Sequence, residues 1–207
     1  MILAPIVLFV YNRLSHTQKT VEALQKNTLA ELSTLIIYSD GPKNSEDKKN
    51  IEEIRIYLKT IIGFKKIQII EKENNEGLAK SIIDGVTETI NKYGKIIVLE
   101  DDIVTSPGFI KYMNDALDLY ENEPLVMHIS GYMYPLAKNK LPETFFYQAA
   151  SCWGWGTWKS AWNLLETNAE VLYKKLQEKK LMDTFNINTI HGFEQQLLDN
   201  ISGKLHT

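Results

Sequence analysis

Three consecutive acidic residues, Glu100, Asp101 and Asp102, directly follow the apolar run Lys95–Leu99. Carboxylate oxygens are the hard ligands that Mg²⁺ and Mn²⁺ prefer. In an extended chain residues 100 and 102 point to one side and residue 101 to the other. We therefore expect Glu100 and Asp102 to share a ligand site, with Asp101 turned away. A divalent ion held there would bridge a diphosphate and neutralise charge on a leaving group; the alternative is a solvated acidic turn.

Two further polar clusters follow apolar runs in the same way. Residues Tyr11–Arg13 come after Ile2–Val10, and Asp40 comes after Thr34–Ser39. Ligands of parallel α/β sheets bind at the carboxyl ends of the strands. If all three runs are parallel strands, the acidic cluster, Arg13 and Asp40 converge on one edge of the sheet.

The elements that would position these residues alternate regularly along the first part of the chain. Apolar runs predict strands, and apolar residues spaced by three and four predict helices. The strands are expected at Ile2–Val10, Thr34–Ser39, Lys66–Glu71 and Lys95–Leu99, and the helices at Ser15–Lys26, Ser45–Ile62 and Glu76–Tyr93. Short strands that are apolar on both faces and separated by helices indicate an α/β fold with a mostly parallel sheet, covered by helices on both sides.

The pattern changes after Pro124. Further strands are expected at Leu125–Ser130 and Thr144–Ala149, and helices at Glu170–Lys180 and His191–Asn200. Between these lie all four tryptophans of the chain, within the stretch 153–162. The first ~120 residues form the candidate nucleotide half, with the boundary uncertainty of any sequence-based assignment.

Composition excludes several classes of protein. The 207 residues include 23 Lys and Arg against 26 Asp and Glu, a net charge of −3, so no strong basic surface for nucleic acid is expected. The single cysteine, Cys152, cannot form an internal disulfide, and no Cys/His spacing indicates a zinc site. The longest apolar run, 1–11, is too short to span a membrane and lacks the features of a signal peptide. A cytoplasmic setting is expected, and peripheral membrane association stays open.

Four segments together resemble the GT-A-fold nucleotide-sugar glycosyltransferases. They are PIVLFVYNR, IIYSDGPK, NNEGLAKSIIDGV and IIVLEDDIVTSPGFIKYMNDAL, in the order and approximate spacing of that family. The most similar patterns are those of family-2-like bacterial transferases and of the N-acetylglucosaminyltransferase that initiates complex N-glycans. The resemblance implies a Rossmann-like GT-A fold in one domain, 1–207, with a nucleotide-sugar-binding half at 1–120 and a helical acceptor half at 121–207. The chain is short for this family, which leaves open a C-terminal truncation.

The resemblance implies that five residues bind the nucleotide. Arg13 would lie near the phosphates, and Asp40 would accept a hydrogen bond from the base N3–H, a contact that suits uracil. Tyr11, Lys80 and Asp101 complete this set. A surface arginine and a turn-forming aspartate are the structural alternatives for the first two.

The donor sugar and diphosphate would be held by Asn75, Gly77, Ser81 and Glu100, again by resemblance. A glycine at this helix start lets backbone approach the diphosphate, and a helix N-terminus favours anions. Asp102 would contact the metal, Mn²⁺ or Mg²⁺, as the last acid of a DxD-like motif.

The segment SCWGWGTWKSAW resembles the acceptor loop of the family, which assigns Trp153, Gly154 and Trp155 to the acceptor. Core packing of the tryptophans is the alternative. In inverting relatives the catalytic base lies on a helix after this loop, and Glu194 occupies that place here. A solvated surface glutamate is the alternative for Glu194.

The resemblance thus implies a metal-dependent, inverting transferase that moves a hexosyl or N-acetylhexosaminyl group from a UDP-sugar to a glycan or lipid-linked acceptor. Synthesis of bacterial surface polysaccharide is the expected setting. A nucleotidylyltransferase is a rival, although the sequence after the first strand lacks the expected glycine-rich loop. A nucleotide-sugar-binding module without catalysis is the second rival. Receiver domains and haloacid-dehalogenase-type phosphatases fit poorly because their further aspartates have no counterpart here.

Overall fold

The computed structural model describes residues 2–135 and 142–204. Within them, residues 2–135 and 151–162 form one compact unit, and residues 142–150 and 163–204 form a second. We describe each unit by itself. The prediction of a single domain over 1–207 stays a prediction.

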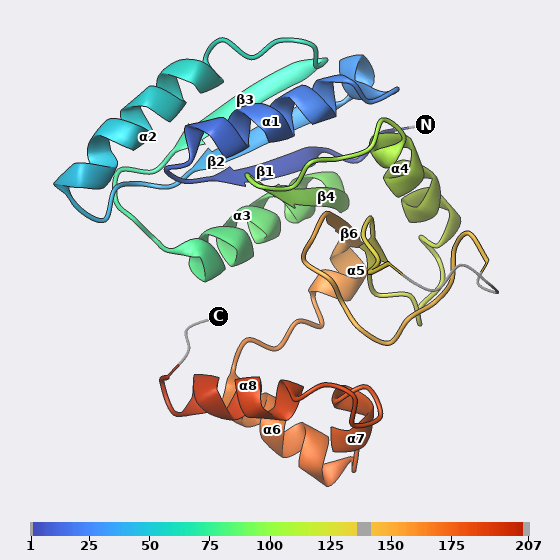
Figure 1. The fold of residues 1–207 in the computed structure, drawn as a ribbon. Coiled ribbons are helices and arrows are strands. Elements are labelled where there is room, and N and C mark those ends of the chain that lie inside the picture. The colour runs from blue at the N-terminus through green and yellow to red at the C-terminus, as the bar shows by residue number, and fades with distance from the viewer. Residues whose placement is uncertain (1, 136–141, 205–207) are drawn as a thin grey trace. The chain divides into compact units, whose positions relative to one another are not determined.

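The first unit is built on a six-stranded sheet (Figure 1). Its strand order is β3-β2-β1-β4-β6-β5, in which β1 to β4 are parallel and β6 is antiparallel to both of its neighbours. The strands are β1 (Ile6–Val10), β2 (Thr34–Ser39), β3 (Lys66–Glu71), β4 (Lys95–Glu100), β5 (Ile129–Ser130) and β6 (Trp155–Trp158). The α/β class and the mostly parallel sheet predicted from the sequence are confirmed.

Helices cover both faces of this sheet. One face packs against α1 (Leu14–Gln25), α2 (Ser45–Leu58) and α4 (Phe109–Leu119), with a short 3₁₀ turn η1 (Ala30–Leu32) beside them. The other face packs against α3 (Leu78–Tyr93) and α5 (Lys159–Trp162). Figure 1 shows α1 and α2 on one side of the parallel strands and α3 on the other.

Alternation along β1 explains why both faces are buried. Ile6 and Leu8 enter the core beneath α1, α2 and α4, while Val7 and Phe9 enter the core beneath α3. All four side chains are at most 4% exposed. A strand buried on both faces reads as a continuous apolar run, which is why the sequence predicts these strands well.

The tryptophan segment supplies a strand that the sequence does not predict. β6 pairs with β4, with Val98 opposite Trp155 and Lys95 opposite Trp158. Trp158 lies in the core beneath α4 and donates through Nε1 to the carbonyl of Leu117 at 2.9 Å. A Cβ on Gly156 would lie 3.0 Å from the Ile96 carbonyl oxygen, so a glycine permits this close pairing.

Two strand predictions after Pro124 need correction. The strand expected over 125–130 is reduced to β5, residues 129 and 130. The strand expected over 144–149 is wrong, since these residues have no strand conformation. Its aromatic residues favour a strand, but β6 takes the position beside β4. Phe146 and Tyr147 are 72% and 51% exposed, so the segment lacks the burial that normally accompanies a strand.

The second unit is helical. It contains α6 (Ala169–Glu178), α7 (Met182–Phe185) and α8 (Phe193–Ile201), and α6 packs against α8. The predicted helices 170–180 and 191–200 therefore correspond to α6 and α8. No helix among the residues described here has the length and apolar character needed to cross a bilayer.

Candidate functional site

The acidic cluster and Arg13 meet at the carboxyl ends of two adjacent strands. β1 pairs in parallel with β4, with Phe9 opposite Glu100, so the residues that follow both strands emerge side by side. The Arg13 Nη2 atom donates to Asp101, and Nη1 lies 3.1 Å from Asp102 Oδ2. One guanidinium thus contacts two carboxylates of the triplet.

The order in which the strands are added to the sheet reverses between β1 and β4. From β1 the chain passes to β2 on one side, whereas β4 lies on the other side of β1. The helices that follow β1 and β4, α1 and α4, cover the same face of the sheet. Arg13 and the acidic cluster lie at the carboxyl ends of these strands, the usual ligand position in open α/β sheets.

The three acids have different surroundings. The Asp101 side chain is 4% exposed, and among the described residues its Oδ2 atom has no hydrogen-bond partner. Asp102 is 41% exposed. Burial raises the pKa of half-buried Glu100, as do the negative charges of Asp102 and Asp101, while Arg13 acts in the opposite direction. The extended chain expected from the sequence is not found here. Residues 101 and 102 form a turn, in which the Ile103 N–H donates to the Glu100 carbonyl at 3.2 Å, and Asp101 and Asp102 both contact Arg13 instead of pointing apart.

The donor set fits a divalent cation that is shared with a substrate. No cluster of three or more His, Cys, Asp or Glu in the described part of the chain could enclose a metal by itself. Mg²⁺ bound with nucleotide phosphates typically takes only one or two carboxylates from the protein and completes its shell with phosphate oxygens and water. Asp102, with Glu100 beside it, can supply that number of hard oxygen ligands, and the buried unpaired oxygen of Asp101 adds negative potential.

Asp40 is fully engaged by the loop that leads into α3. Its Oδ1 atom accepts from the backbone N–H groups of Gly41 and Glu76, both at 2.9 Å. Its Oδ2 atom accepts from Asn75 Nδ2 at 2.9 Å and from the Gly77 N–H at 3.1 Å. A carboxylate has about four acceptor positions, and all are used here. A contact from Asp40 to a base N3–H, which stays a prediction, requires one of these donors to move.

This loop and the first turns of α3 carry three of the four residues predicted to hold the donor, Asn75, Gly77 and Ser81, while Glu100 lies at the end of β4. Gly41 approaches the loop so closely that a Cβ there would lie 2.4 Å from the Asn74 carbonyl carbon. Gly77, with φ of 80°, precedes α3 in a conformation that favours glycine. Ser81, in the first turns of α3, is buried, and its Oγ atom has no hydrogen-bond partner among the described residues.

Lys80 and Tyr11 are predicted to bind the nucleotide, and in the structure both contact acidic side chains. Lys80 is exposed and contacts Asp84 and Glu76, which raise the pKa of its ammonium group. Tyr11 donates to Asp47 at 2.7 Å, and burial together with this bond raises its pKa to about 12. Neither interaction indicates a nucleotide by itself.

Arg55 is a residue of this site that the sequence analysis missed. From α2, its guanidinium donates to the carbonyls of Asp40 and Ser39 at 3.3 Å and of Lys72 at 2.6 Å. It therefore joins the ends of β2 and β3 beneath Asp40. A basic residue within an otherwise apolar helix stripe, between Ile54 and Leu58, is the only signal that the sequence offers.

The predicted acceptor loop divides into an exposed and a buried part. Trp153 is 45% exposed, and Gly154 takes a positive φ of 76°. Trp155 is 9% exposed and stacks on His128 at 5.5 Å and on Trp162 at 6.0 Å. Its ring belongs to the core beneath α3, so we narrow the proposed acceptor loop to Trp153 and Gly154.

Glu194 lies in the second unit, near the start of α8. Its backbone N–H donates to Asn186 Oδ1 at 2.9 Å, and its carboxylate accepts from the Tyr173 hydroxyl at 3.4 Å. The side chain is half-buried, while Leu197 on the same helix is buried. Glu194 is thus a fixed carboxylate at the edge of the helix's buried face, and its catalytic role stays a prediction.

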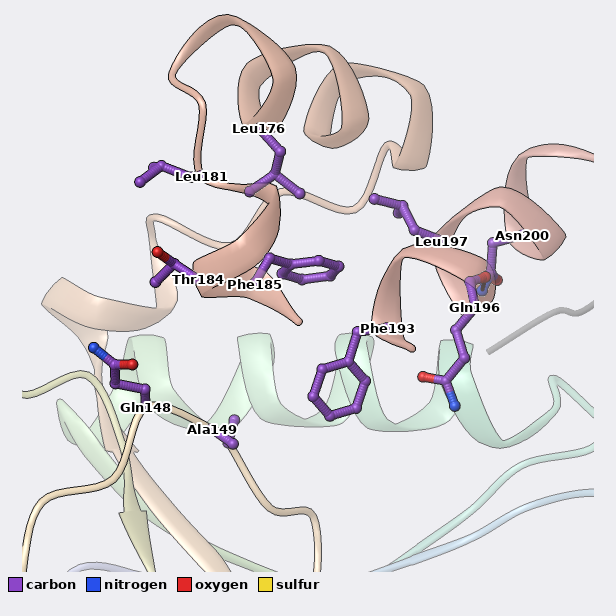
Figure 2. Close-up of a pocket in the computed structure, with 11 residues that line it drawn as sticks. Gln148, Ala149, Leu176, Leu181, Thr184, Phe185, Phe193, Gln196, Leu197 and Asn200 are labelled. Atoms are coloured by element: carbon purple, nitrogen blue, oxygen red, sulfur yellow. Dashed lines mark hydrogen bonds between the residues drawn. The ribbon is translucent and has the colours of Figure 1, made fainter. Parts of the chain in front are cut away.

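The second unit also contains an open, mostly apolar pocket of about 480 Å³ (Figure 2). Figure 2 shows Leu176, Phe185 and Leu197 directed toward one another across it. The lining contains the amides of Gln148, Gln196 and Asn200 but no carboxylate or basic group. The pocket therefore has no groups suited to bind a diphosphate or a metal.

A model of glycosyl transferase family 2 matches residues 6–198, nearly the whole chain. The chain belongs to glycosyl transferase family 2. The sheet and its flanking helices are accordingly a Rossmann-like GT-A fold, as the sequence resemblance implies.

Three solved structures that are similar to this family 2 chain are distant from it in sequence. S. aureus TarS 1–349 is 12% identical over 76% of this chain and 47% of its own length, with a TM-score of 0.45. Glycosyltransferase GlyE from Streptococcus pneumoniae is 15% identical over 96% and 43%, with a TM-score of 0.40. The Pyrobaculum calidifontis mannosyltransferase PcManGT, solved with GDP-Man and Mn²⁺, is 8% identical over 62% and 35%, with a TM-score of 0.42.

The family 2 chain spans less than half the length of each of these proteins. No curated protein matches it in sequence. The activity and the substrates are therefore argued from the site.

Proposed function

We propose that this protein transfers a sugar from a nucleotide-diphosphate donor, preferably a UDP-sugar, to an acceptor hydroxyl with the help of Mn²⁺ or Mg²⁺. The observation that carries the proposal is the contact of Arg13 with Asp101 and Asp102 at the carboxyl ends of β1 and β4. A guanidinium beside the exposed carboxylate of Asp102 and the half-buried carboxylate of Glu100 suits a ligand that carries both phosphate and a divalent metal. Membership of family 2 supplies the reaction class.

Each group has a defined task in this proposal. Asp102, with Glu100 beside it, holds the metal, which when bound offsets the negative charge of the diphosphate. Arg13 is half-exposed and binds the phosphates as charge develops on the leaving group. Asn75 and Gly77 form the wall against which the donor lies, because Asp40 holds their loop in place. Arg55 is a positioning residue for that wall.

The acceptor hydroxyl must lose its proton as it attacks the anomeric carbon. We propose Glu194 as the base that takes the proton, and inversion of configuration as the outcome. Asn186 accepts from the backbone N–H of Glu194 and the Tyr173 hydroxyl donates to the Glu194 carboxylate, and a carboxylate positioned in this way is suited to that task. The acceptor is a glycan or a lipid-linked sugar, and we propose a cytoplasmic role in bacterial surface polysaccharide synthesis.

A panel of nucleotides tests this function directly. We would record thermal unfolding with UDP, GDP, CMP and dTDP, each with and without Mn²⁺. A ligand at about 100 times its Kd adds about 2.7 kcal/mol, which for a chain of this size raises Tm by about 5–11 °C. The proposal expects this rise for UDP with Mn²⁺ and much less for CMP, whose N3 is an acceptor. No rise with any nucleotide would contradict it.

A binding module without catalysis is the alternative, because the chain covers less than half of the similar solved proteins. Slow hydrolysis of the UDP-sugar in the absence of acceptor distinguishes the two. A transferase releases UDP in a Mn²⁺-dependent manner, whereas a binding module binds the donor and leaves it intact.

A further inference from the structure

Three aromatic side chains in the first unit form an exposed cluster, which we call the aromatic platform: Tyr132, Tyr134 and Trp153. Their ring centroids lie 4.6 Å apart for Tyr132 and Trp153, 5.9 Å for Tyr134 and Trp153, and 5.4 Å for the two tyrosines. Tyr134 is 62% exposed and Trp153 is 45% exposed. The three rings are in mutual contact, and two of them, Tyr134 and Trp153, are exposed, while Tyr132 is half-buried.

The backbone fixes the platform from two segments of chain. Ser130 is paired with Trp155 in the sheet, and the Gly131 N–H donates to the Gly154 carbonyl at 2.7 Å. The Ser130 hydroxyl donates to the Tyr132 carbonyl at 2.9 Å, which holds the turn after β5. A Cβ on Gly131 would lie 2.4 Å from the Phe109 ring, so this residue must be small for the segments to meet. The rings are therefore pre-positioned by ordered backbone.

The platform lies at the same edge of the sheet as the acidic cluster. The register of β6 and β4 places Trp155 opposite Val98. Continued by two residues, this antiparallel register brings Trp153 level with Glu100. The next residue, Gly154, lies against Ile103, whose Cγ2 would be 3.7 Å from an added Cβ. Trp153 is thus a close neighbour of the acidic turn.

The strand order puts the platform on the far side of the acids from Asp40. Asp40 follows β2, the acids follow β4, and the platform surrounds the adjoining ends of β6 and β5. Along this edge of the sheet, the spatial order is therefore Asp40 and its loop, then the acidic cluster, then the aromatic platform. A nucleotide bound between Asp40 and the acids would direct its sugar toward the rings.

The chemistry of the platform suits a sugar ring. Pyranoses present flat C–H surfaces that stack on aromatic faces, and their hydroxyls bond to polar groups at the ring edges. The tyrosine hydroxyls of the platform form no hydrogen bond with any other described residue, so they remain available to such a ligand. Exposed apolar groups gathered in one patch commonly mark a binding site.

We propose that Tyr132, Tyr134 and Trp153 bind one uncharged pyranose ring of the acceptor glycan. Recognition of this ligand as an acceptor depends on the proposed function, whereas sugar binding by the platform does not. Trp153 and Tyr134 provide the stacking faces, and Tyr132 supports the Trp153 ring from beside it.

Methyl glycosides of glucose, galactose, mannose, N-acetylglucosamine and N-acetylgalactosamine are the probes. Binding to the full chain is measured by saturation-transfer NMR and tryptophan fluorescence titration, with UDP and Mn²⁺ absent and present. The variants are Trp153→Ala and Tyr134→Ala, and the matched control is Tyr147→Ala, which removes an exposed tyrosine of the second unit. Near-UV circular dichroism checks that each variant is folded.

We expect at least one glycoside to bind the wild-type protein, and its affinity to fall by up to roughly tenfold in each platform variant, since an aromatic contact contributes at most about that factor. Tyr147→Ala should bind like wild type. Equal binding by all forms, or no binding by any, would overturn the platform proposal even if UDP binds with Mn²⁺. Self-association that Trp153→Ala abolishes, without glycoside binding, would also overturn it in favour of a protein interface. Failure of UDP binding alone would contradict the proposed function and leave the glycoside result to decide the platform.

Discussion

Arg13 Nη1 lies 3.1 Å from Asp102 Oδ2, although the residues belong to segments far apart in the chain. The contact exists because β1 and β4 are parallel neighbours, so the residues after both strands emerge together. In this arrangement Arg13 neutralises the acid that we propose as the metal ligand. A divalent cation at Asp102 would free one side of the guanidinium for a phosphate.

Replacement of Arg13 tests its proposed phosphate contact. Arg13→Gln should weaken UDP binding in the presence of Mn²⁺ by about tenfold or more, because a charge-assisted hydrogen bond contributes about 1.5–3 kcal/mol. Isothermal titration calorimetry measures the change. Lys111→Gln removes the same charge from an exposed position on α4 and serves as the control. Similar affinities for the two variants would exclude a specific role for Arg13.

The hydrogen bonds that Asp40 accepts from the loop before α3 should contribute to the free energy of unfolding. In Asp40→Asn the new NH₂ group faces two N–H donors, either those of Gly41 and Glu76 or those of Asn75 and Gly77, and a buried donor left unpaired costs about 1–3 kcal/mol. Urea unfolding should show a loss of that size. The preference for UDP over CMP should decline as well, because the loop is no longer held. An unchanged unfolding free energy would mean that the four hydrogen bonds of Asp40 contribute little.

His128 predicts a pH dependence of stability. Burial lowers its pKa, while its contact with the Ser151 carbonyl acts the other way. As the pH falls, the His128 ring is therefore protonated first in the unfolded chain, near pH 6.5. Stability from His128 is fully present above about pH 6.5 and is lost as pH falls from there through the lower folded pKa.

Thermal unfolding between pH 8 and pH 5 tests this (roughly the range around the ordinary histidine pKa). The decline of Tm on acidification should be smaller in His128→Asn than in wild type. His16→Asn, at an exposed position of α1, is the control and should follow wild type. Parallel curves for wild type and His128→Asn would refute the linkage.

Glu194→Gln tests the proposed base. The variant should bind UDP with Mn²⁺ like wild type but transfer sugar roughly 10²–10⁴-fold more slowly. Glu178→Gln, an exposed glutamate at the end of α6, controls for loss of charge in the helical unit. Transfer at the wild-type rate would rule out Glu194, and Asp183 and Asp199 would then be tested in that order.

Some of this structure could be predicted from the sequence, and the reasons are physical. β2 and β3 were predicted with their observed bounds because continuous apolar runs end at turn residues. β6 was missed because Trp155–Trp158, with its glycine, reads as a loop until β4 is known as its partner. The stretch 144–149 has strand composition but no neighbouring strand to pair with.

The candidate site could likewise be predicted only in part from the sequence. The strand ends that carry Arg13, Asp40 and the acids could be predicted, because parallel strands present their carboxyl ends at one edge. That Arg13 contacts Asp101 depends on β1 and β4 being adjacent, which no local pattern reveals. Three of the four hydrogen bonds to Asp40 come from a loop that is far away in the sequence, with a separation of 37 residues for Gly77, and only the one from Gly41 is local.

Calorimetric titration of UDP into the protein, with and without Mn²⁺, tests the central claim most directly. The claim is that Asp102 holds the metal that binds the diphosphate. The account predicts that Mn²⁺ strengthens UDP binding to the wild-type protein, that Asp102→Asn abolishes this gain while the fold survives, and that Asp115→Asn, at an exposed position of α4, retains it. UDP binding to Asp102→Asn that responds to Mn²⁺ as in wild type would contradict the account.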